Sequence, residues 1–272
     1  MILSCQFIAN RIKEEVKERL RKIETGVPHL VSIRVGEHKD AEVYTKVQRK
    51  LCKEIGIEYS LKQFKDSVCE DELLSFIRHL NKDRRVNGII VHLPLPEHIR
   101  KQKVFSSIEV EKDVEGMHTC SDILPCTPLA IMEILKYTKV KLKGREVVVV
   151  GSGDCVGKPL FPLLLERMPT LTVCNIATHH LSLHTQRADI LIVGIGEPNF
   201  IQPEMVKKGA VVIDAGINYL NGRIVGDVDR RVENKAKFLT PVPGGVGVVT
   251  SAILMRNTLK CFLKQMRGRR DG

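Results

Sequence analysis

Short apolar runs rich in β-branched residues alternate along this chain with longer amphipathic segments. In the first half, the periodicity predicts helices at 6–24, 40–55 and 70–82 and strands at 30–35, 57–64 and 88–93. Alternation of strand and helix is typical of a mainly parallel sheet covered by helices. One compact α/β lobe is therefore expected here.

A second lobe of the same kind is expected after a helix at 128–138, which Thr127 should cap and Pro128 should open. Its strands are predicted at 146–150, 171–174, 189–193 and 210–213, and a last amphipathic helix at about 249–265. The predicted fold class is α/β, with two lobes, a cleft between them, and ligands at the carboxyl ends of the strands.

Composition narrows the class of protein further. With 272 residues, 43% of them hydrophobic and 28% charged, the chain is expected to be a soluble globular protein. Apolar runs fall short of the roughly 18 to 20 residues that cross a bilayer, and the N-terminus lacks the basic region of a signal peptide. Eight scattered cysteines without a zinc-like spacing predict reduced thiols, no metal site and a cytosolic location.

The net charge of +11 raises the alternative of nucleic-acid binding. Aromatic residues make up only 4% of the chain, tryptophan is absent, and the basic residues cluster only at 267–270. A basic surface suits a polyanionic small molecule equally well. We expect neither a nucleic-acid nor a membrane partner.

Two glycine-rich segments favour ligand binding. Residues 238–247 join two prolines, which fix φ, to three glycines that permit left-handed backbone, so a flat ligand can approach the chain. Val147–Gly157 reads as a buried strand, a Gly-x-Gly turn and a helix start, which suits the pyrophosphate of a dinucleotide. The third glycine comes one residue late, and an ordinary turn remains the alternative in both segments.

Three further sites carry polar side chains where a ligand would meet them. His92 follows a buried strand, and Asp113 and Glu115 flank a valine just before Gly116. Tyr44 and Gln48 lie four residues apart, hence on one face of a helix. Taken singly, each has an ordinary structural explanation.

Together these segments resemble the methylenetetrahydrofolate dehydrogenase/cyclohydrolase family across about 30–260. The matching pieces, in chain order, are 35–36, Tyr44 with 50–57, 86–91, 93–96, 112–116, 125–128, 156–159, 212–218, 225–228 and 241–247. The resemblance implies a folate-binding catalytic domain at 1–127, against which 248–272 packs back, and a Rossmann-type NAD(P)-binding domain at 128–247. It also implies a homodimer.

The resemblance assigns roles to particular positions. Tyr44, Gln48 and His92 would line the reacting centre, with Tyr44 also stacking on the aminobenzoate ring of the folate. The remaining substrate-binding positions are Glu115, Pro243, Gly244 and Gly245. The cofactor-binding positions are Gly151, Ser152, Gly153, Val156, Gly157, Asn175, Ile176 and Ile217.

Four positions differ from the family pattern, and they determine which of the family's reactions we expect of this chain. The catalytic lysine of the family is Gln48 here, its helper glutamine is His92, a serine is Ala41, and the pterin aspartate is Glu115. Gln48 is no general base, so hydrolysis should suffer more than hydride transfer. The segment 123–131 and the missing lysine resemble the monofunctional NAD-dependent dehydrogenases of fungal type.

The expectation is therefore oxidation of methylenetetrahydrofolate by NAD, with weak or absent cyclohydrolase. NAD is favoured because Ser152 and Ile176 replace residues that hold the 2′-phosphate of NADP in relatives. One alternative is a bifunctional enzyme that uses NADP, with His92 in the place of the lysine. Another is an inactive folate- or nucleotide-binding protein.

Overall fold

The computed structural model describes residues 1–268, apart from the side chains at 39 and 40. The chain divides into two compact units. Unit 1 comprises Met1–Ala9 and Pro125–Thr250, and unit 2 comprises Asn10–Leu124 and Ser251–Gly272. Each unit contains a parallel sheet with helices, which confirms the predicted α/β class. The domain boundaries inferred at 127/128 and 247/248 stay a prediction.

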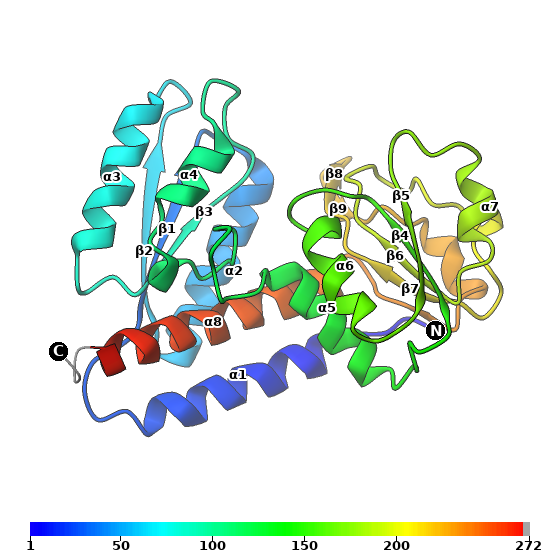
Figure 1. Ribbon diagram of the computed structural model, residues 1–272, viewed down its shortest axis with the longest axis horizontal. Coiled ribbons are helices and arrows are strands. Elements are labelled where there is room, and N and C mark those ends of the chain that lie inside the picture. The colour runs from blue at the N-terminus through cyan, green and yellow to red at the C-terminus, as the bar shows by residue number, and fades with distance from the viewer. Residues whose placement is uncertain (269–272) are drawn as a thin grey trace. The chain divides into compact units, whose positions relative to one another are not determined.

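Unit 2 contains a three-stranded parallel sheet in the order β2-β1-β3 (Figure 1). Its strands are β1 (His29–Val35), β2 (Glu58–Phe64) and β3 (Gly88–Val91). Its helical segments are α1 (Gln6–Arg21), which begins in unit 1, α2 (Lys39–Ile55), α3 (Glu70–Lys82), α4 (Lys101–Ser107) and η1 (Val110–Lys112). Parallel pairing brings the carboxyl ends of all three strands to one edge.

Strand β1 has two different faces because successive side chains point to opposite sides of a sheet. Val31, Ile33 and Val35 belong to a core that includes Leu73 and Ile77 of α3. Ser32 and Arg34 alternate with them and are also buried. The second face of β1 therefore buries polar groups, which need partners.

The long helix α8 (Val246–Gly268) contributes its residues from Ser251 onward to unit 2. The side chains of Asn87 and Gln265 exchange a hydrogen bond of 3.0 Å, and Gln265 Nε2 donates to the carbonyls of Asn87 and Glu111. By length and hydropathy, α8 would suffice to span a membrane, but 67% of its apolar window is buried within the molecule. That burial is typical of a core helix.

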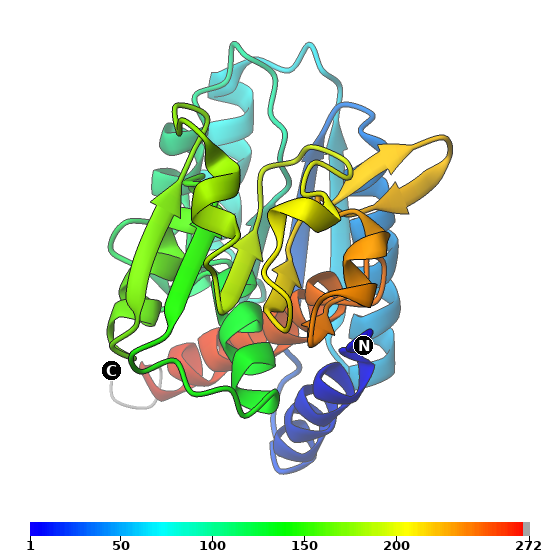
Figure 2. The ribbon, with the colours of Figure 1, turned by 90° about the vertical axis from the view of Figure 1, so that its right-hand side faces the viewer.

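Unit 1 contains a five-stranded parallel sheet in the order β10-β7-β6-β4-β5 (Figure 2). The strands are β4 (Glu146–Val150), β5 (Thr170–Cys174), β6 (Ile190–Val193), β7 (Val211–Asp214) and β10 (Phe238–Leu239). The helices are α5 (Cys126–Tyr137), α6 (Gly157–Leu165), α7 (Leu181–Thr185), η2 (Pro203–Met205) and η3 (Arg230–Asn234). Valine and isoleucine fill β4, β6 and β7, as expected of strands covered on both faces.

Some element ends differ from the sequence prediction. Helix α5 begins at Cys126 after Pro125, so Thr127 is not its N-cap. Helix α8 begins at Val246, three residues early, and takes in the end of the glycine segment. The antiparallel hairpin of β8 (Asn218–Leu220) and β9 (Arg223–Val225) was not predicted, because its three-residue strands give no clear alternation.

Candidate functional site

In unit 2, three polar side chains meet near the carboxyl ends of β1 and β3. Ser32 lies on β1, Gln48 lies on α2, and His92 directly follows β3. The Ser32 hydroxyl lies 2.7 Å from His92 Nε2 and donates to Gln48 Oε1 at 3.3 Å. His92 also extends the strand pairing, because its backbone N–H donates to the Ile33 carbonyl at 2.9 Å. The structure thus brings together two of the predicted reacting-centre residues, Gln48 and His92.

Burial and charge set the protonation of this cluster. Gln48 is 3% exposed and His92 is 8% exposed. Burial, reinforced by the positive charge of Arg34, lowers the pKa of His92 to about 4. The imidazole is therefore neutral at pH 7, and it retains a lone pair that can accept a proton.

Arg34 is a fixed cation at the same sheet edge. It is 9% exposed, and its guanidinium donates to Gln63 Oε1 at 2.6 Å. Its Nε atom is buried without a hydrogen-bond partner in the described part of the chain. Arg34 therefore supplies a positive charge that acts on His92, whereas the Gln48 side chain is neutral.

Two tyrosines border this cluster. Tyr44 precedes Gln48 by one helical turn on α2 and is partly exposed, which leaves its ring accessible. Burial raises the pKa of the Tyr59 hydroxyl, and the nearby Ser32 hydroxyl offsets part of that shift. The Tyr59 hydroxyl nevertheless makes no hydrogen bond to the residues that the structure describes.

In the turn at 113–118, the two acids Asp113 and Glu115 have different surroundings, which the sequence alone did not distinguish. The buried Asp113 carboxylate accepts hydrogen bonds from the backbone N–H groups of Gly116 and His118, at 3.0 and 2.9 Å. Asp113 therefore shapes the turn. Glu115 is half-buried, and burial of its carboxyl, followed by repulsion from Asp113, raises its pKa to about 8. Glu115 remains the acid available to a ligand.

In unit 1, the turn after β4 is built on glycine. Gly151 has a φ of +113°, and a Cβ there would collide with the Gly194 carbonyl. A Cβ at Gly157, the first residue of α6, would collide with the Gly151 carbonyl. Around Gly153 the space is open. The turn thus brings a helix N-terminus and exposed backbone together, and it suits a pyrophosphate.

The remaining cofactor-binding candidates lie around this turn. Ser152 and Val156 are partly exposed, and Val156 Cγ1 is the atom that a Cβ at Gly194 would meet, at 3.2 Å. After β5, Asn175 Oδ1 accepts from the Ala177 N–H at 3.0 Å, so this side chain holds its own loop. Ile176 is fully exposed, with neither an acid nor an arginine beside it in the segment 174–178.

Two buried carboxylates shape the loops that follow β6 and β7. Asp227 Oδ2 accepts from the N–H groups of Ile195 and Gly196, at 2.6 and 3.0 Å, while Asp227 Oδ1 accepts from Asn218 at 2.8 Å. Asp214 Oδ1 accepts from the N–H groups of Gly216 and Asp227. The network therefore fixes the backbone on both sides of the predicted cofactor residue at position 217.

Burial raises the pKa of Asp214 to about 7, against the lowering effect of its backbone hydrogen bonds. Sequence reasoning covered Asp214 and Asp227 only through the family match and did not reveal that they hold the loops beside the candidate cofactor site. Ser32 and Arg34 were missed too. Polar residues at alternate positions of an otherwise apolar strand were the signal that could have revealed them.

The proline–glycine segment also lies in unit 1. Pro243 follows a cis peptide bond, and Gly244 has a φ of +100°. A Cβ at Gly245 would collide with the Pro241 carbonyl. Both glycines are therefore required by the backbone itself, and the predicted contact of 243–245 with substrate stays a prediction.

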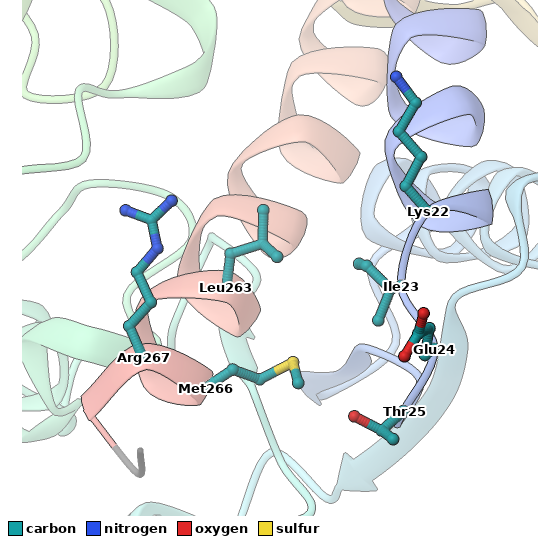
Figure 3. A pocket seen from close by; sticks show the side chains of 7 residues that line it. All are labelled: Lys22, Ile23, Glu24, Thr25, Leu263, Met266 and Arg267. Carbon is teal, nitrogen blue, oxygen red and sulfur yellow. The ribbon is translucent and has the colours of Figure 1, made fainter. Parts of the chain in front are cut away.

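Unit 2 also contains a pocket of about 250 Å³ that is lined by other residues than the polar cluster (Figure 3). The loop after α1 and the end of α8 line it, with Lys22, Glu24 and Arg267 as its charged residues. It contains none of the predicted site residues. We do not assign the chemistry to this pocket.

A dinucleotide turn in one parallel-sheet unit and a polar cluster at strand ends in another define a two-unit NAD(P)-dependent enzyme. The chain belongs to the tetrahydrofolate dehydrogenase/cyclohydrolase family. Residues 3–115 match the catalytic domain of that family, and residues 125–266 match its NAD(P)-binding domain. The predicted family and the predicted enzyme class are confirmed.

Relatives match over almost their full length. The bifunctional protein FolD of Nautilia profundicola is 41% identical, over 98% of this chain and 99% of the relative. The crystal structure of the bifunctional enzyme from Campylobacter jejuni is 40% identical, with a TM-score of 0.91 over 97% of this chain and 99% of that one. The enzyme from Trypanosoma brucei, complexed with NADP and an inhibitor, is 32% identical with a TM-score of 0.92, over 98% of each chain.

The expected likeness to monofunctional enzymes of fungal type is not supported. The NAD-dependent dehydrogenase of Saccharomyces cerevisiae is 24% identical, with a TM-score of 0.78, which shows a shared fold alone. The relatives at about 40% identity are named bifunctional. The missing lysine and the segment 123–131 pointed to the fungal type, but identity over the whole chain is higher to the bifunctional relatives.

Proposed function

We propose that this chain oxidises methylenetetrahydrofolate to methenyltetrahydrofolate with NAD(P) and then hydrolyses the product to 10-formyltetrahydrofolate. This is the bifunctional alternative, and it replaces our expectation of weak or absent cyclohydrolase. The observation that carries it is the buried pair of Gln48 and His92, joined through Ser32. Kinship with bifunctional relatives at about 40% identity supports it.

The oxidation step asks little acid–base chemistry of the protein. A bound nicotinamide would supply the hydride acceptor for the bridging carbon. The residues that would hold the dinucleotide are Gly151, Ser152, Gly153, Val156, Gly157 and Ile217, and the open backbone at Gly153 fits a pyrophosphate. Tyr44 would orient the folate and Glu115 would bind the pterin. Proximity and orientation then supply most of the rate.

Hydrolysis needs a general base, and His92 is the proposed one. Water attacks the bridging carbon of the methenyl cation while its proton passes to the neutral imidazole. The carbon–N5 bond then breaks, the carbinol proton moves to N5, and the formyl group remains on N10. Gln48 would orient the water by hydrogen bonding, because its neutral amide neither gains nor loses a proton at pH 7.

We further propose that NAD is the better cofactor. Ser152 and the fully exposed Ile176 offer no positive charge to a 2′-phosphate, whereas arginine binds phosphate with two parallel hydrogen bonds. The comparison of kcat/KM for NAD and NADP tests this, with Ile176→Arg expected to shift the ratio toward NADP. A wild-type preference for NADP would refute it. The homodimer and the cytosolic location stay predictions.

The main test supplies methylenetetrahydrofolate with either cofactor and records reduced nicotinamide, methenyl product and formyl product separately. Wild type should form all three, and His92→Ala should lower hydrolysis by about 10²- to 10⁴-fold while it retains oxidation. His79→Ala, at an exposed position on α3, is the matched control. Accumulation of the methenyl product by wild type would refute the hydrolytic half of the proposal. Absence of turnover would refute both halves.

A further inference from the structure

The Ser32 hydroxyl forms the centre of the cluster in unit 2. It is fully buried, and its two hydrogen-bonding neighbours are His92 Nε2 at 2.7 Å and Gln48 Oε1 at 3.3 Å, while the Tyr59 hydroxyl lies nearby and makes no hydrogen bond to the described residues. A serine hydroxyl carries one hydrogen and two lone pairs. It can therefore donate to only one of these two neighbours.

Hydrogen counting selects one arrangement. With the Gln48 amide placed so that its oxygen faces Ser32, Oε1 can only accept, so Ser32 donates to it. Ser32 Oγ must then accept at its other contact, and His92 Nε2 must carry the proton. With the amide in this orientation, the opposite tautomer would place two acceptor oxygens face to face in a buried site, which is costly.

The charge state of His92 completes the argument. Burial and Arg34 lower its pKa to about 4, so the ring carries a single proton at neutral pH. If that proton lies on Nε2, the lone pair lies on Nδ1. No hydrogen bond from the described residues engages Nδ1. Among the described residues, the Ser32 hydroxyl contacts the ring and the charge of Arg34 acts on it, and both residues belong to β1.

We infer that Ser32 is a positioning residue, which holds His92 in the Nε2–H tautomer and thereby presents Nδ1 as the base. The inference rests on the proposed hydrolysis for its consequence, but the tautomer itself can be observed without any turnover. Ser32 holds the neutral His92 ring in one tautomer, as the carboxylate of a catalytic triad does for its histidine. Unlike that carboxylate, Ser32 carries no charge.

The direct test is NMR of protein labelled with ¹⁵N-histidine, at pH 7, through long-range ¹H–¹⁵N correlations. His92 is assigned from the signals lost in His92→Gln. Wild type should show a protonated Nε2 and an unprotonated Nδ1, and Ser32→Ala should show a mixture of tautomers. Ser32→Thr keeps the hydroxyl and should restore the single tautomer.

The chain provides a matched control. Ser60 Oγ lies 2.8 Å from His29 Nε2 on β2 and β1, an exposed serine–histidine pair in the same sheet. Ser60→Ala should change the signals of His29 and leave those of His92 and the hydrolysis rate unchanged. Ser32→Ala should lower the kcat of hydrolysis by about tenfold or more with little change in KM, since the base is misoriented and the binding surface is intact.

Two results would overturn the inference. One is an Nδ1–H tautomer in wild type, which needs no variant and so does not depend on how Ser32→Ala folds. The other is an unchanged Nε2–H tautomer in folded Ser32→Ala. If wild type lacks hydrolysis, the proposed function fails, whereas the NMR result still decides whether Ser32 sets the tautomer.

Discussion

The strand ends of the two units are built on different principles. In unit 2, the groups at the sheet edge are side chains, namely Ser32, Arg34, Gln48 and His92. In unit 1, the corresponding edge is mostly backbone, shaped by Gly151 and Gly194 and held by Asp214 and Asp227. The first edge suits proton transfer, and the second suits a ligand that binds through backbone N–H groups.

The difference predicts how each edge responds to substitution. A changed side chain in unit 2 should alter rate or protonation while the fold persists. A changed glycine or carboxylate in unit 1 should disturb the backbone, and with it both stability and binding. The following experiments probe that contrast.

The largest effect is expected for Gly151→Ala. The new methyl group meets the Gly194 carbonyl at a φ of +113°, so the turn must shift. Strain of about 1–3 kcal/mol and a displaced pyrophosphate turn should weaken dinucleotide binding by roughly 100-fold or more, measured by calorimetry. Gly153→Ala, which enters open space, is the matched control and should fold like wild type. Equal binding by the Gly151 variant would contradict the steric argument.

Asp227→Ala should destabilise unit 1. The substitution leaves the N–H groups of Ile195 and Gly196 and the amide of Asn218 without their acceptor. The free energy of unfolding should fall by about 3 kcal/mol or more, as followed by urea denaturation. Asp229→Ala removes the cap of η3 together with an exposed ion pair to Arg231 and should cost about 1 kcal/mol. If the free energy of unfolding fell equally in the two variants, the buried hydrogen bonds of Asp227 would stabilise unit 1 no more than an exposed cap does.

His92 should make stability depend on pH. Its pKa is about 4 in the folded chain against an ordinary 6.5, so between these values the unfolded chain binds a proton that the folded chain does not. Stability should therefore decline as pH falls from 6.5 to 4, by about 3 kcal/mol in total. Urea unfolding of wild type and His92→Gln at pH 7 and 5 measures this. Replacing the exposed His179 by Gln should leave the slope unchanged, and an equal slope in His92→Gln would exclude His92 as its source.

The smallest effect expected is on folate affinity. Burial raises the pKa of Glu115 to about 8, so its carboxylate becomes abundant only as pH rises past that value. If the ionised form accepts hydrogen bonds from the pterin, the KM for folate should fall by about tenfold between pH 7 and 9. Glu115→Gln should abolish this trend, and the exposed Glu97→Gln should preserve it. A pH-independent KM in wild type would argue against Glu115 as the anchor.

Much of the fold was predictable because β-branched runs and helical periodicity are local signals. The strands 146–150, 170–174 and 190–193 lie within one residue of their predicted bounds. Local pattern failed where ends depend on neighbours. Pro125 precedes the helix that Thr127 was expected to cap, and Asn218, the first residue of the short hairpin, donates a buried hydrogen bond to Asp227.

The candidate site was predictable only in part, for a similar reason. The four-residue spacing of Tyr44 and Gln48 placed both on one helix face, and His92 was placed at a strand end. The hydroxyl that joins Gln48 to His92 comes from Ser32, which is 16 and 60 residues away in sequence. The separation of Asp113 from Glu115 depended on which backbone N–H groups each carboxylate meets. These contacts arise from tertiary structure, and spacing alone does not reveal them.

The two faces of β1 also bear on how such a chain can change over generations. The odd-numbered positions Val31, Ile33 and Val35 belong to the core that includes α3, while on the other face Ser32 contacts His92 and Arg34 donates to Gln63. Substitutions at positions 32 and 34 can therefore change the polar face of β1 without disturbing the apolar packing on its other face. A one-residue insertion within β1 would exchange the two sets and lose both together.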